Sequence, residues 1–157
     1  MTNLRNVTYG TVHSLGYSAI ETVVFLYLFN SLGVYMTIIC ADPSPVSLFK
    51  LERSIRKIKP ASSVHLCKKT DCAISEAKKR GCDVLITEID FGGKKGEGIE
   101  LASRILELFP SVNVIFATSA PVRDYAPLIM KIKYSGYLTK PFAIEELEKE
   151  FNYLRHR

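Results

Sequence analysis

With 157 residues, the chain is long enough for one domain with a single core, and 47% of its residues are hydrophobic. Its formal net charge is +5, but the basic residues are mostly spaced as on solvated helix faces, with no aromatic residues interleaved. We therefore expect no direct contact with nucleic acid. The four cysteines do not form the pattern of a small secreted scaffold, so reduced, largely buried thiols in a cytoplasmic protein are expected.

Residues 1–35 differ from the rest, because Arg5 and Glu21 are their only charged side chains. The uncharged stretch after Glu21 is nominally long enough to cross a bilayer, although polar residues interrupt it. Three interpretations of this apolar extension stay open, in order of preference. Translation begins at Met36 and the extension is a start-site artefact, or the extension is a loosely packed helix, or it is a membrane anchor. The domain itself is expected to span residues 36–157.

From Met36 onward, short apolar runs of strand length alternate with stretches of helical periodicity. The expected strands are 37–41, 64–67, 84–86, 112–118 and 136–139. The expected helices lie within 45–58, 70–80, 99–109, a short segment starting near Pro127, and 144–154. Strict alternation of this kind implies right-handed crossovers and an open parallel sheet. The predicted fold is therefore an α/β, flavodoxin-like (βα)5 three-layer sandwich with a five-stranded parallel sheet.

The third expected strand leads into two carboxylates, Glu88 and Asp90, and then into a glycine-rich loop over 91–98. Side chains alternate across a strand, so residues 88 and 90 are expected to point to the same side. In parallel sheets, ligands and chemistry collect outside the carboxyl ends of the strands. The two acids therefore indicate a candidate site at that edge.

Polar side chains also follow the other central strands. Asp42 follows the first strand, Thr118 ends the fourth, and Lys140 follows the fifth. Parallel strands bring these ends to one edge of the sheet, where acids, a hydroxyl and an ammonium would meet. Carboxylates can serve as a nucleophile and as Mg²⁺ ligands, while a lysine and a hydroxyl bind phosphoryl oxygens. The set thus suits phosphoryl chemistry.

Over Met36 to about Leu154, the chain resembles a receiver domain of a two-component response regulator. Four segments carry the resemblance: Ile38–Asp42, Asp83–Glu88, Val114–Ser119 and Ser135–Phe142. The last of them contains Gly-Tyr-Leu-x-Lys-Pro-Phe, which is typical of receivers and rare elsewhere.

The resemblance implies roles for four residues. Lys140 takes the place of the family's invariant lysine, and Pro141 follows a cis peptide bond. Thr118 corresponds to the switch hydroxyl, and Tyr137 corresponds to the switch aromatic residue.

The chain departs from the receiver pattern at the acids. Receivers usually carry two adjacent acids after the first strand, but here Asp42 is followed by Pro43, which offers no metal ligand. Counting forward from Asp83 places Glu88 at the phosphoacceptor position, whereas counting back from Gly98 places Asp90 there. We favour Glu88, because the first count needs only an insertion in a surface loop.

A glutamate at this position predicts an atypical pseudo-receiver. Its carboxylate lies one methylene farther out than that of an aspartate, which disturbs in-line attack, and one Mg²⁺ carboxylate is missing. The longer acid can instead reach toward Lys140 and Thr118 and partly mimic an aspartyl phosphate. The expected function is a phosphorylation-independent signalling module that is not an enzyme and needs no cofactor.

The expected partner is another protein or a second copy of the chain. In receivers the face formed by helix four, strand five and helix five makes such contacts. Here that face would include Lys131, Lys133 and Tyr137, together with the acidic run Glu145, Glu146, Glu148 and Glu150. The competing interpretation is a working phospho-receiver that takes its phosphoryl group from a histidine kinase onto Asp90 and binds Mg²⁺ through Asp42 and Asp90. A further alternative is the detached receiver of a transcriptional regulator.

Overall fold

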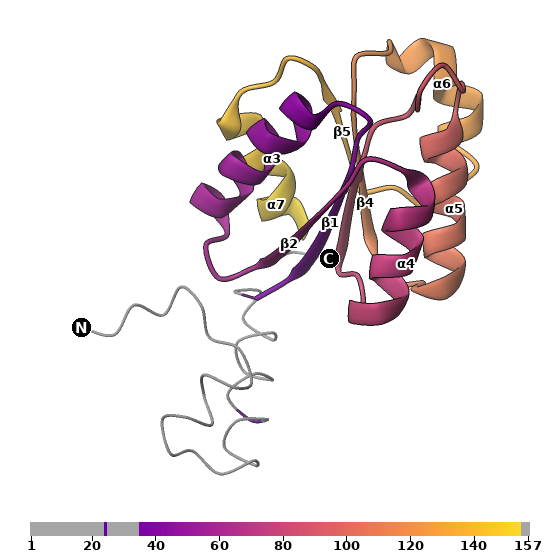
Figure 1. Cartoon of the computed structure of the whole chain (residues 1–157). Helices are drawn as coiled ribbons and strands as arrows, with labels where there is room; N and C mark the ends of the chain where they lie inside the picture. Colours follow the sequence, from indigo (N-terminus) through magenta and orange to yellow (C-terminus); the bar gives the residue numbers. More distant parts are fainter. Residues whose placement is uncertain (1–23, 25–34, 155–157) are drawn as a thin grey trace.

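The structure is a computed structural model that describes residue 24 and residues 35–154 (Figure 1). The apolar extension predicted over residues 1–35 therefore falls almost entirely outside the described residues. Within the described part of the chain, no helix is both long and apolar enough to span a bilayer. From residue 37 onward, strands and helices alternate strictly. In chain order they are β1 (Thr37–Ala41), α3 (Pro45–Ile58), β2 (Ser63–Cys67), α4 (Thr70–Arg80), β3 (Val84–Thr87), α5 (Glu97–Leu108), β4 (Asn113–Thr118), α6 (Val122–Ile129), β5 (Gly136–Thr139) and α7 (Ile144–Leu154).

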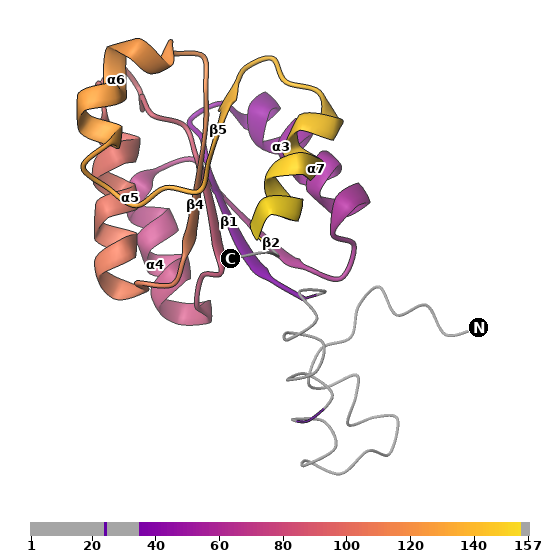
Figure 2. The ribbon, with the colours of Figure 1, turned by 180° about the vertical axis from the view of Figure 1, so that it is seen from behind.

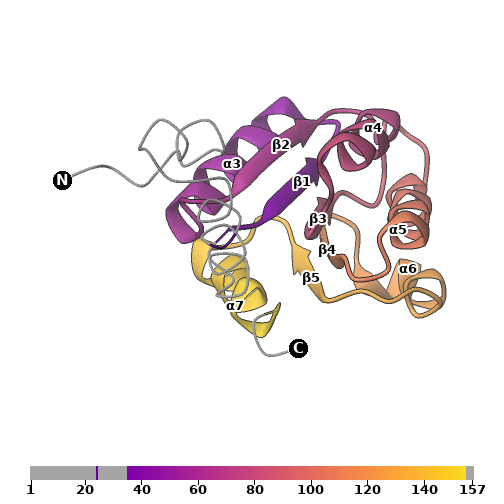
Figure 3. The ribbon, with the colours of Figure 1, turned by 90° about the horizontal axis from the view of Figure 1, so that it is seen from below.

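The five strands form one parallel sheet in the order β2-β1-β3-β4-β5. Helices α3 and α7 cover one face, and α4, α5 and α6 cover the other, as Figures 2 and 3 show from behind and from below. This arrangement confirms the predicted flavodoxin-like three-layer fold. It also brings the carboxyl ends of β1, β3, β4 and β5 to a single edge.

Each strand contributes to two hydrophobic cores, because successive side chains point to opposite faces of the sheet. In β1, Ile39 packs with the helices α4 to α6, whereas Ile38 and Cys40 pack with α3 and α7. The central strand β3 is buried at every position. A sheet covered on both faces explains why its strands are continuous apolar runs.

The first helix after β1 begins where its sequence signals place it. The Ser44 side chain caps α3 by accepting a hydrogen bond from the Ser47 amide at 3.3 Å, and Pro45 occupies the first helical position. Leu48, Leu51 and Ile55 form the buried stripe of this helix, as their spacing predicts.

Helix α6 corrects the prediction that a short helix starts near Pro127. The helix begins at Val122, and Pro127 lies inside it. Proline is disfavoured inside a helix because it cannot donate the backbone hydrogen bond. Here burial outweighs that cost, since Tyr125 and Ile129, four residues apart, both pack into the core.

Gly98, in the first turn of α5, allows this helix to approach the end of β3. Its amide donates to the carbonyl of Ile89 at 2.8 Å. A Cβ atom at this position would lie 1.8 Å from the backbone oxygen of Glu88. Because residue 98 has no side chain, α5 can pack directly against the backbone that carries Glu88.

We expect Gly98→Ala to destabilise the fold by about 2–3 kcal/mol through overpacking, although alanine is the better helix former. Gly92→Ala is the matched control, because no atom lies within 4 Å of its added methyl group, although its φ of +55° adds some strain. Urea unfolding of both variants measures the difference. Equal stabilities would contradict the close approach of α5 to Glu88.

Candidate functional site

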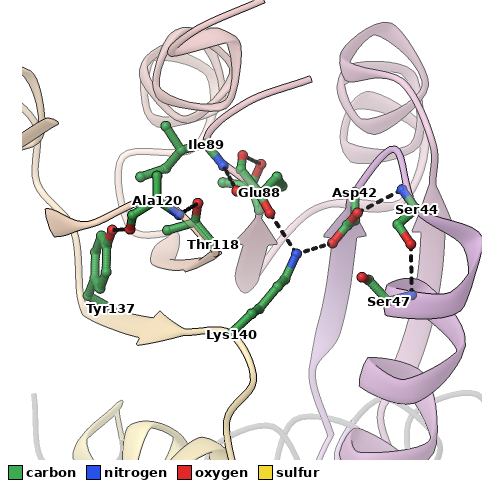
Figure 4. Close-up of polar contacts among 10 residues, drawn as sticks. Asp42, Ser44, Ser47, Glu88, Ile89, Thr118, Ala120, Tyr137 and Lys140 are labelled. Carbon is green, nitrogen blue, oxygen red and sulfur yellow. Dashed lines mark hydrogen bonds and ion pairs between the residues drawn. The ribbon is translucent and has the colours of Figure 1, made fainter. Parts of the chain in front are cut away.

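Three charged side chains meet at the carboxyl edge of the sheet (Figure 4). The Lys140 ammonium donates to Asp42 Oδ2 through a very short contact and to Glu88 Oε2 at 2.7 Å. These residues follow β5, β1 and β3, so the contact joins three separate strand ends. The predicted convergence of the acids and the lysine is thus present for Asp42, Glu88 and Lys140.

Backbone groups hold both carboxylates in place. The second oxygen of Asp42, Oδ1, accepts from the Ser44 amide at 2.8 Å, and Glu88 Oε1 accepts from the Ile89 amide at 2.8 Å. The Glu88 amide in turn donates to the Ala41 carbonyl at 2.8 Å, which sets its loop beside β1. Each acid therefore has a lysine on one oxygen and an amide on the other.

The ion pairs are largely shielded from water. Only 6% of the Asp42 side chain and 11% of the Glu88 side chain are exposed, against 19% for Lys140. A shielded charge is stable only when it is paired and hydrogen-bonded, which all three groups are. Removing one member would leave a partly buried charge without its partner.

The two expected switch residues lie next to this cluster but bond to the backbone rather than to the acids. Thr118 is buried at the end of β4, where its Oγ1 accepts from the Ala120 amide at 3.1 Å and its carbonyl accepts from the Lys140 amide at 2.8 Å. The Tyr137 hydroxyl donates to the Ala120 carbonyl at 2.6 Å. Both side chains therefore hold the β4–α6 segment at Ala120. The Lys140–Pro141 peptide bond is cis, as the resemblance implies.

Asp90 corrects the expectation that its side chain would share the site with Glu88. Strand β3 ends at Thr87, so the alternation rule does not extend to residue 90. The Asp90 carboxylate instead accepts from the Tyr125 hydroxyl at 2.6 and 2.7 Å and from the Gly96 amide at 2.8 Å. The pKa of Tyr125 is raised to about 12, mainly by its hydrogen bond to Asp90 and secondly by burial.

The residues at this edge do not fit a Mg²⁺ ion. The Pro43 side chain supplies no oxygen ligand, and the Asp42 oxygens are bound to Lys140 and Ser44. The Asp90 carboxylate is bound to Tyr125 and Gly96. Between residues 35 and 154, no group of three or more acidic, histidine or cysteine side chains is arranged to hold a metal ion. Magnesium prefers several oxygen ligands in near-octahedral geometry, which this set does not offer.

Sequence reasoning missed the groups that surround the acids. Nothing in the sequence marks Tyr125, 35 residues beyond Asp90, as its partner. The Ser44 and Ile89 amides were missed because backbone donors carry no sequence signal.

Comparison with known proteins places this geometry in a family. The response regulator receiver domain family matches residues 38–152. The chain is 30% identical to the transcriptional regulatory protein RcsB of Salmonella typhi over 115 residues, which are 73% of this chain and 53% of that protein. RcsB of Escherichia coli K12 is 29% identical over the same length. The chain thus spans about half the length of the curated relatives it matches.

Solved structures show the same fold. The isolated REC domain of RcsB from Salmonella enterica serovar Typhimurium, in the presence of phosphomimetic BeF3−, is 28% identical with a TM-score of 0.64, covering 73% of this chain and 84% of that one. A response regulator receiver domain protein from Clostridium thermocellum is 21% identical with a TM-score of 0.67, covering 78% and 95%. With the family match spanning residues 38–152, this chain belongs to the response regulator receiver domain family.

Proposed function

We propose that this chain is a pseudo-receiver, a receiver that signals through protein contacts without being phosphorylated and without acting as an enzyme. In this proposal Glu88 stands at the phosphoacceptor position. The observation that carries it is the contact of the Lys140 ammonium with both Glu88 and Asp42. The three charged groups of the site are thereby paired with one another.

The Glu88 carboxylate supports the proposal through its place and its partners. One oxygen lies 2.7 Å from Lys140 Nζ and the other accepts from Ile89, so both are already hydrogen-bonded within the chain. A carboxylate carries one negative charge, whereas a phosphoryl group carries about 1.5 to 2. Glu88 would therefore hold Lys140 as a phosphoryl group does, but more weakly.

Asp90 is the acceptor in the competing function, a Mg²⁺-dependent phospho-receiver. Its carboxylate is already bound by Tyr125 and Gly96, and it makes no described contact with Lys140. Phosphorylation there would first have to break the Tyr125 hydrogen bonds and would lack the lysine that stabilises the transferred group. These costs favour the pseudo-receiver.

The proposed partner surface lies over α6, β5 and α7, next to the residues that hold Ala120. The α6–β5 connection exposes Lys131, Lys133 and the 80%-exposed Met130, while α7 exposes acidic side chains. The exposed acidic residues of this surface are Glu145, Glu146 and Glu148, while Glu150 is half-buried beside Gly136 of β5. Opposite charges on one face suit contact with a protein or with a second copy of the chain.

A second candidate follows from the relatives, which are named transcriptional regulatory proteins and are about twice as long as the matched segment. The chain would then act as the receiver of a transcriptional regulator. Any effect on DNA would come through a partner or a further segment, since the matched residues 38–152 form the receiver.

The first test is incubation with acetyl phosphate and Mg²⁺, followed by intact-mass measurement. We expect no added phosphoryl group, because Glu88 is held by Lys140 and Ile89 and the Mg²⁺ ligand set is incomplete. The double variant Pro43→Asp, Glu88→Asp restores both acids of the receiver pattern and is the matched positive control.

A phosphoryl group that is added to the unmodified chain and lost in Glu88→Gln would contradict phosphorylation independence. The same group lost only in Asp90→Asn would instead establish the competing function.

The second test replaces Tyr125 by phenylalanine, which removes the hydroxyl that binds Asp90. We expect a loss of about 1–2 kcal/mol in the free energy of unfolding at pH 7. The raised pKa of Tyr125 means that this stabilisation is fully present below its ordinary pKa of about 10 and is lost as pH rises through about 12.

Urea unfolding at pH 7, with ultraviolet titration of the tyrosines, measures both effects. Tyr153→Phe is the control, because Tyr153 is 66% exposed. If Tyr125→Phe unfolds at the same urea concentration as this control, Asp90 is not held as described.

A further inference from the structure

A pocket of about 420 Å³ opens beside the ion pairs, between α3 and the turn that follows β5. The pseudo-receiver function makes no use of it. Figure 4 shows Asp42 and Ser47 on one side and Lys140 on the other. Its wall includes Asp42, Lys50, Ser119, Lys140 and Phe142. This volume lies within the range of sites for small organic molecules.

Hydrogen-bond donors dominate the polar part of the wall. An ammonium has three donors, and Lys140 gives two of them to Asp42 and Glu88, so one remains. The hydroxyls of Ser47, Ser54 and Ser119 make no hydrogen bond to another described residue. Five donor groups, counting Lys50, can therefore serve a ligand.

The charges favour an anion over a cation. Asp42 is the only acid in the wall, and both of its oxygens are bound, to Ser44 and to Lys140. Lys50 forms no ion pair with any described residue, so its ammonium is free to bind. A ligand that offers only acceptors would satisfy these donors, whereas a cation would meet two ammonium groups.

The rest of the wall is apolar. Leu51 and Ala117 are buried, and Pro141 and Phe142 close the opposite side. Such surface binds hydrocarbon or an aromatic ring. An inorganic ion would leave this part of the pocket unused.

We propose that the pocket binds a small organic anion, a carboxylate or phosphate monoester with a short apolar or aromatic part. The acid group accepts from Lys50, Lys140 and Ser119, and the apolar part lies on Leu51 and Phe142. The ligand would bind Lys140 while Glu88 stays in contact with that lysine, so it would bind beside the ion pairs without displacing Glu88. The proposal does not depend on whether the chain is phosphorylated.

The test is a titration of the ¹⁵N-labelled full chain, followed by amide chemical shifts. Phenyl phosphate and phenylacetate are the two anionic probes, and benzyl alcohol and inorganic phosphate are the controls. We expect shifts at Ser47, Lys50, Ser119 and Phe142 with at least one anionic probe, and the probe that binds more tightly identifies the acid group.

Lys50→Gln should weaken that binding about five- to tenfold, because a charge-assisted hydrogen bond is lost. Lys57→Gln, on the same helix but outside the pocket wall, should leave the affinity unchanged. The proposal is overturned if neither anionic probe shifts these amides, or if benzyl alcohol or inorganic phosphate binds as tightly as the anionic probes. It is also overturned if the two lysine variants bind alike.

Discussion

The Lys140 ammonium, held between two carboxylates, is the interaction on which the carboxyl edge of this sheet depends. It joins the ends of β1, β3 and β5, and all three side chains are largely shielded from water. Two carboxylates that both contact one ammonium would repel each other without it. The negative charges of Asp42 and Glu88 therefore both depend on Lys140 for their stability. Because the amides of Ser44 and Ile89 bind the remaining oxygens, the cluster is satisfied by the chain itself.

Hydrogen bonds connect the residues around these ion pairs to helix α6. The Lys140 amide is bonded to Thr118, and the side chains of Thr118 and Tyr137 both bond to the backbone of Ala120, where the chain enters α6. From the other side, Tyr125 of α6 holds Asp90 in the glycine-rich loop. A short series of hydrogen bonds therefore links the segment that carries Lys140 to α6.

Strand ends were the part of the site that sequence could predict. A parallel sheet brings the residues after β1, β3 and β5 together whatever the loops do, so Asp42, Glu88 and Lys140 followed from the alternation of elements. Asp90 could not be placed, because its direction depends on β3 ending at Thr87 and on a tyrosine 35 residues away. The start of α6 was misjudged because a local rule about Pro127 was outweighed by the burial of Tyr125 and Ile129. The apolar extension falls almost wholly outside the described residues, so its interpretation stays a prediction.

The coupling energy between Glu88 and Lys140 tests most directly whether a fixed ion pair governs this site. It is measured by a double-mutant cycle of urea unfolding with Glu88→Gln, Lys140→Met and both together. We predict a favourable coupling of about 1–3 kcal/mol, because the two side chains are in contact and poorly exposed. A coupling near zero would contradict the fixed ion pair and, with it, the mimicry of a phosphoryl group by Glu88.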